Sequence, residues 1–208
     1  MIKKLPLIEL LIDPDKESFV SAISLVSQPA VESSFIVFSD DKTGFNNYQQ
    51  FKFDSDEKKE LMGIAMRADT PIYRNDPAMG EFLVTFSKDT IRLITQTFAK
   101  KGFNNNMNLE HSTVDAESFV FQSYVVDDEK GITAPKNIDA KDGDWIVGVK
   151  VESDAVWNDI KGGLRSGFSV EGIFDLIDTK TIIDFQFATS QPLTFEQELD
   201  ALISKYNL

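Results

Sequence analysis

The sequence has no cysteine and only one histidine among its 208 residues. Without cysteine the chain can form no disulfide, offers no thiol nucleophile and cannot hold a metal through sulfur. A chain of this kind fits a reducing cytoplasm, so we expect the protein to act there. One imidazole and scattered carboxylates match no metal-binding or phosphate-binding spacing, which predicts neither a metal nor a cofactor.

Long apolar runs and an excess of positive charge are also missing. No stretch approaches the roughly 18 apolar residues that a membrane helix needs. Pro6, Glu9 and Asp13 interrupt the apolar N-terminus, so we expect neither a signal peptide nor a membrane partner. The 34 acidic and 21 basic residues give a net charge of −13. Because basic contacts with phosphates drive nucleic-acid binding, we expect no nucleic-acid partner and interpret the acidic surface as solubilising.

The length predicts a single domain covering residues 1–208. Within it, residues 39–60 combine Asp, Gly, Asn and charged residues with little periodicity, which predicts a flexible loop. Residues 190–208 predict a C-terminal helix, because Thr194 can cap an amphipathic repeat. We expect the apolar stripe of that helix to pack on the protein's own sheet rather than to dock a partner helix.

Strands outnumber helices in the pattern of the chain. Runs rich in Val, Ile, Phe and Tyr predict strands at residues 19–26, 35–38, 81–86, 118–126, 145–151, 168–177 and 182–187. The last two would form a hairpin around residues 178–181. Helices are expected at residues 88–101, after the capping residue Ser87, and at residues 154–161. This irregular mixture indicates an α+β fold with a mainly antiparallel sheet or barrel.

Two residues have side chains suited to catalysis. His111 ends a polar run of asparagines, and imidazole can act as a general base because its charge changes near neutral pH. Ser169 lies in Gly167–Gly172 at the start of an apolar strand, where the flanking glycines let another chain approach closely. Neither position alone establishes a function, since a lone histidine is commonly structural and a strand can begin with serine for no functional reason.

Several runs that occur in a fixed order carry more information than either residue alone. They are residues 22–30, 86–88, 108–112, 145–151, 156–157 and 167–172. The ordered set resembles the XkdF-like phage serine proteases, relatives of the prohead proteases of tailed phages. The resemblance covers about residues 7–175 of this chain.

The resemblance implies an α+β fold related to herpesvirus assemblin, with a small, mainly antiparallel β-barrel surrounded by helices. It also implies Ser169 as the nucleophile and His111 as its base. The third catalytic member stays open, because Ala22 stands where the better-known prohead proteases have an acidic residue. Ser24, Glu171 or Asp184 could orient His111, or no residue does so.

The resemblance further implies a capsid-maturation endopeptidase. It would cleave scaffold and major capsid precursors inside the assembling prohead in the host cytoplasm, with the virion as a further location and a homo-oligomer as one option. The alternative is a catalytically weak or inactive protein that keeps the protease fold as a structural or assembly component of the virion. A plain binding module unrelated to phage is the third interpretation.

Overall fold

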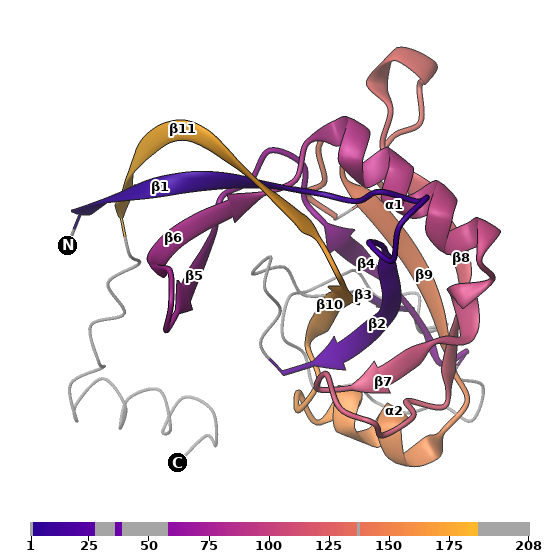
Figure 1. The fold of residues 1–208 in the computed structure, drawn as a ribbon. Helices are drawn as coiled ribbons and strands as arrows, with labels where there is room; N and C mark the ends of the chain where they lie inside the picture. Colours follow the sequence, from indigo (N-terminus) through magenta and orange to yellow (C-terminus); the bar gives the residue numbers. More distant parts are fainter. Residues whose placement is uncertain (1, 28–35, 39–57, 137, 187–208) are drawn as a thin grey trace, which may run out of the picture.

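The structure is a computed structural model that describes residues 2–27, 36–38, 58–136 and 138–186 (Figure 1). Its strands are β1 (Ile2–Leu11), β2 (Val20–Val26), β3 (Ile36–Phe38), β4 (Glu60–Met66), β5 (Ile72–Asp76), β6 (Gly80–Thr85), β7 (Met107–Leu109), β8 (Ser118–Val125), β9 (Trp145–Val151), β10 (Gly167–Gly172) and β11 (Asp175–Gln186). The α-helices are α1 (Lys88–Lys100) and α2 (Asp154–Lys161), and the short 3₁₀ helices are η1 (Phe103–Asn105) and η2 (Asp128–Lys130).

The strands form three sheets, with the orders β11-β1-β6-β5, β10-β2-β7 and β3-β4-β9-β8. The pairs β1–β6 and β2–β7 are parallel, and the other pairs are antiparallel. The first sheet reaches away from the rest of the molecule, and we call it the arm (Figure 1). The other two sheets and both α-helices form what we call the body.

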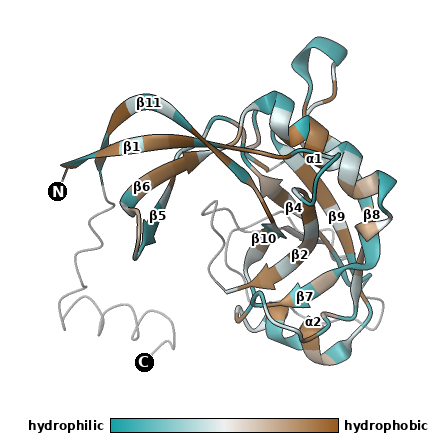
Figure 2. Cartoon of the chain, in the orientation of Figure 1, coloured by the Kyte–Doolittle hydropathy of each residue, from teal (hydrophilic) through white to brown (hydrophobic). Residues whose placement is uncertain are grey.

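The body contains the main hydrophobic core. Trp145, Phe98 and Phe168 are its largest fully buried side chains. The buried cluster of the arm is much smaller and consists of Ile8, Phe82 and Val84. Figure 2 shows hydrophobic stretches along the strands of both regions, but in the arm several large apolar side chains remain exposed. They are Ile2, Leu176, Ile177 and Ile182.

The two α-helices predicted at residues 88–101 and 154–161 are confirmed, and local sequence explains them. Ser87 caps α1 by accepting a hydrogen bond from the backbone N–H of Thr90, and Ser153 caps α2 in the same way. The buried face of α1 includes Ile91, Ile94 and Phe98, at the spacing expected of an amphipathic helix. None of the helices in the described residues is long and apolar enough to cross a membrane.

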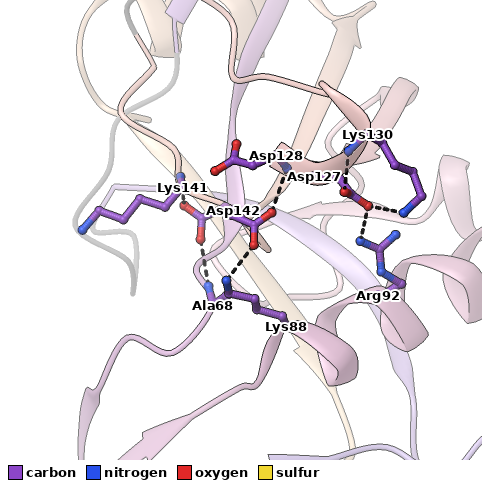
Figure 3. A network of polar contacts seen from close by, with 9 residues as sticks. Ala68, Lys88, Arg92, Asp127, Asp128, Lys130, Lys141 and Asp142 are labelled. Carbon is purple, nitrogen blue, oxygen red and sulfur yellow. Dashed lines mark hydrogen bonds and ion pairs between the residues drawn. The ribbon is translucent and has the colours of Figure 1, made fainter.

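A network of ion pairs fixes the long connection between β8 and β9 (Figure 3). Asp127 accepts hydrogen bonds from Arg92 of α1 and from Lys130, and it is only 4% exposed. Asp142 accepts from the Lys88 side chain and from the Asp128 backbone N–H. Because every acceptor is an ionised carboxylate, these bonds belong to the stronger class and hold the connection against α1.

The α+β class is confirmed at the level of a mostly β chain with two helices, but no closed barrel is present in the described residues. The strands divide among three sheets because β11 leaves the body to pair with β1 along its whole length. The expected hairpin at residues 178–181 is wrong for the same reason. β10 ends at Gly172, and residues 178–181 lie inside β11, where the register against β1 shifts between Leu7 and Ile8.

Two further expectations concern segments with little or no description. Most of the predicted loop at residues 39–60 lies outside the described residues, and its last residue, Glu60, begins strand β4. The predicted C-terminal helix at residues 190–208 also lies outside them. Sequence reasoning missed four strands, β1, β4, β5 and β7.

Candidate active site

The sheet β10-β2-β7 brings the polar residues of three distant chain segments onto one face. β10 runs antiparallel to β2, which places Ser169 opposite Ser24. β7 runs parallel to β2 on its other side and places Asn108 beside Ser24. Residues that face each other across neighbouring strands point to the same side of a sheet, and Glu171 joins them because it lies two residues beyond Ser169. His111 follows the end of β7 by two residues.

The imidazole of His111 lies against this polar face. Its Nδ1 is 3.1 Å from Ser24 Oγ and 3.2 Å from Glu171 Oε1. Ser24 Oγ is 2.6 Å from the same Glu171 oxygen and 2.7 Å from Asn108 Oδ1, so its single proton can go to either acceptor. Asn108 Nδ2 donates to Glu171 Oε1 at 2.5 Å. The Glu171 carboxylate is therefore the common acceptor of the cluster.

The contact between His111 and Glu171 requires one particular tautomer of the imidazole. An ionised carboxylate can only accept hydrogen bonds, so a bond between Nδ1 and Glu171 requires the proton to be on Nδ1. In a neutral imidazole this leaves the lone pair on Nε2, the form that a general base needs. The arrangement can thus hold His111 ready to accept a proton at Nε2.

The electrostatic environment keeps Glu171 ionised. Burial by itself raises the pKa of the Glu171 carboxyl group, but hydrogen bonds from Ser24, Asn108 and His111 outweigh it. The pKa of Glu171 therefore lies below its ordinary value, because these donors stabilise the charged form. At neutral pH the group is a carboxylate that can orient an imidazole and stabilise an imidazolium.

The turn that carries His111 has an uncommon backbone. Glu110 and His111 both adopt left-handed conformations, with φ of 51° and 55°. Such residues are uncommon outside glycine and persist only where surrounding contacts hold them. Here the Glu110 carboxylate accepts a hydrogen bond from the Ser27 backbone N–H at 2.7 Å and forms an ion pair with Arg165. These contacts fix the turn, and sequence reasoning did not assign roles to Glu110 or Arg165.

The two predicted catalytic residues are brought into one neighbourhood without a direct bond. Ser169 is 8% exposed, and no hydrogen bond joins its hydroxyl to His111 in the described part of the chain. The side chain of His111 is 44% exposed. Catalytic hydrogen bonds are often long in the absence of substrate, so this geometry leaves the assignment of Ser169 and His111 as a prediction.

Of the residues considered for orienting His111, Ser24 and Glu171 both contact its Nδ1. Asp184 does not take part, because it lies in the arm opposite Lys4. Ala22 lies directly opposite Glu171 across β2 and β10. The resemblance leads one to expect an acidic residue at position 22. In this chain the carboxylate is instead that of Glu171, on the neighbouring strand β10.

A pocket of about 150 Å³ adjoins Ser169 at the junction of body and arm. Its walls are mainly apolar, and two arginines, Arg67 and Arg74, also line it. The described residues contain no group of three or more His, Asp or Glu side chains that could hold a metal ion. The chemistry available near Ser169 is therefore that of a hydroxyl, an imidazole, a carboxylate and guanidinium groups.

Residues 49–178 match the model of a protein family described as "Putative phage serine protease XkdF". The chain belongs to this family. It is also similar to the phage-like element PBSX protein XkdF of Bacillus subtilis (strain 168), with 27% identity over 131 residues. That match covers 63% of this chain but only 42% of the relative. No solved structure matches the chain.

The matched region contains His111, Ser169 and Glu171, whereas Ser24 lies outside it. The family description therefore agrees with the resemblance stated from the sequence at the level of a phage serine protease-like protein. The likeness to assemblin has no structural match in its support.

Proposed function

We propose that this protein is a serine endopeptidase in which Ser169 is the nucleophile and His111 the general base. The observation that carries the proposal is the contact of His111 Nδ1 with Glu171 at 3.2 Å, on a face that Ser169 shares by strand register. An imidazole oriented by a carboxylate next to a serine hydroxyl is the arrangement that serine proteases of unrelated folds use. The family description supports the same class of reaction.

In the proposed reaction, Ser169 Oγ attacks the carbonyl carbon of the scissile peptide bond, and its proton passes to His111 Nε2. Collapse of the tetrahedral intermediate breaks the C–N bond, and His111 returns the proton to the leaving amine. Water then hydrolyses the acyl-enzyme by the same route. Glu171 stabilises the imidazolium that forms during both acylation and deacylation. Ser24, hydrogen-bonded to Glu171 and His111, helps to hold the imidazole in position.

We further propose that the substrates are phage scaffold and major capsid precursors, cleaved within the assembling prohead. Co-expression of this chain with the capsid and scaffold proteins of its own phage tests this. The proposal expects discrete truncation of the partners, which disappears with Ser169→Ala while shells still assemble. Intact precursors after hours of incubation, analysed by mass spectrometry, would contradict it.

A protein of the same fold that serves as a structural or assembly component of the virion is the second candidate. It is favoured by the absence of a hydrogen bond between Ser169 and His111 in the described residues. This candidate predicts uncut capsid proteins and a fixed number of copies of the chain in mature particles. Quantitative mass spectrometry of purified particles distinguishes the two.

A further inference from the structure

The pocket beside Ser169 combines walls from both regions of the molecule. The body contributes Ser169 from β10 and Arg67, which directly follows β4, whereas the arm contributes Ile72 and Arg74 from β5. Its volume of about 150 Å³ is enough for one side chain, since an engineered apolar cavity of that size can hold benzene. Ser169 is among the lining residues, so a side chain in the pocket lies close to the proposed nucleophile.

The two arginines differ in their partners. Arg67 lies 3.4 Å from the buried Asp144 carboxylate and also donates to the backbone carbonyl of Asp139. Arg74 donates a hydrogen bond only to the carbonyl group of its neighbour Tyr73, and it forms no ion pair with any described residue. Arg74 therefore has guanidinium donors left for a ligand, whereas the charge of Arg67 is already compensated.

The position of Arg74 on its strand places it on an apolar face. Register sets Arg74 opposite Phe82 and sets Ile72 opposite Val84 across β5 and β6. Phe82 and Val84 belong to the buried cluster of the arm, so Arg74 shares a sheet face with that cluster. Arg74 is nevertheless exposed, and the partial burial of its guanidinium lowers its pKa, without an acidic partner among the described residues.

We infer that this pocket binds an acidic side chain of the substrate and that Arg74 determines the specificity. The chemistry fits glutamate best, because its methylene groups can contact the apolar walls while its carboxylate reaches the guanidinium. Arginine and a carboxylate can form two parallel hydrogen bonds, which fixes both partners. The inference rests on the proposed function, since it identifies the pocket as the one beside the scissile bond.

Binding can be measured separately from cleavage. In the full chain carrying Ser169→Ala, we would titrate two acetylated tripeptide amides, Ala-Ala-Glu and Ala-Ala-Gln, and measure their dissociation constants by isothermal titration calorimetry. We expect the glutamate peptide to bind about tenfold more tightly, because one charge-assisted hydrogen bond contributes a difference in affinity of that size. Arg74→Gln should remove this preference, and Arg92→Gln, an arginine outside the pocket, should keep it. Equal affinity for the two peptides, or a preference that survives Arg74→Gln, would overturn the inference.

A charge reversal guards against a variant that loses binding only because the arm is disturbed. In Arg74→Glu we expect the preference to invert in favour of a lysine peptide, and a retained preference for glutamate would again contradict the inference. Cleavage by the unmodified chain then separates the two proposals. Efficient cleavage after residues other than glutamate or aspartate would overturn the inference about the pocket but would agree with the proposed protease activity. Selective binding of the glutamate peptide without cleavage of any peptide would support the inference about the pocket and contradict the proposed protease activity.

Discussion

The body and the arm differ in how much they bury and in what they contribute. The body has a continuous core around Trp145 and Phe98, and it positions the cluster of His111 and Glu171. The arm has a buried cluster of only three residues and exposes apolar side chains such as Ile182, yet it brings Arg74 to the pocket. On the proposed function, the body with its extensive buried core would hold the reacting groups, whereas the arm with its small buried cluster would supply the residue that selects the substrate.

The largest expected effect comes from Glu171→Gln in the body. A glutamine can donate a hydrogen bond to Nδ1 and so favours the tautomer that cannot act as a base at Nε2. We expect cleavage of the capsid precursor to slow by about 10²- to 10⁴-fold, with folding unchanged. The rate constant for cleavage at saturating enzyme measures this.

The matched control for that variant lies in the arm. Ile182→Ser changes a side chain that is 67% exposed and that does not line the pocket, so its rate should equal that of the unmodified chain. A similar loss of rate in both variants would show that the division of roles between body and arm is wrong.

Two truncations compare the cores directly. Phe98→Ala leaves a cavity in the body core, where the residue is 1% exposed, and should lower the free energy of unfolding by about 3–5 kcal/mol. Phe82→Ala removes a ring from the small arm cluster, where fewer buried side chains surround it, so we expect a smaller loss of at most about 3 kcal/mol. Urea denaturation of both variants measures these values. Equal losses would mean that the arm is as well packed as the body.

The smallest effect tests how the turn of His111 is held. Glu110→Gln keeps an acceptor for the Ser27 N–H but loses the ion pair with Arg165. Because Glu110 acts through the position of His111, we expect kcat to fall about tenfold while KM stays unchanged. Glu129→Gln, at an exposed position in η2, serves as the control. A change in KM alone would assign Glu110 to substrate binding instead.

The same contrast explains what sequence reasoning could achieve. The helices of the body were predictable because Ser87 and Ser153 cap amphipathic repeats, and β9 was predictable because its apolar run is continuous. The pairing of β1 with β11 in the arm was not, because β1 contains Pro6 and Glu9 and the bulge in β11 has the composition of a turn, although β6 of the arm was predicted at residues 81–86. Pairing of β1 with β11 joins residues far apart in the chain, and no local pattern records it.

The candidate site was predictable only in part for a related reason. His111 and Ser169 have recognisable local contexts, and Glu171 was one of three candidates to orient the histidine. The choice among them depends on strand register, which places Glu171 and Ser24 at Nδ1 and sends Asp184 into the arm. Arg74 gives no signal in the sequence, because it belongs to a strand that was not predicted.

The central claim is that His111 activates Ser169, and labelling with a fluorophosphonate tests it most directly. The reagent forms a covalent bond with an activated serine and releases fluoride, and peptide mass spectrometry identifies the modified residue. We expect Ser169 to be labelled in the unmodified chain, labelling to be lost with His111→Ala, and its rate to fall with Glu171→Gln. Labelling of Ser169 at equal rates in all three proteins, or labelling of Ser24 instead, would contradict the claim.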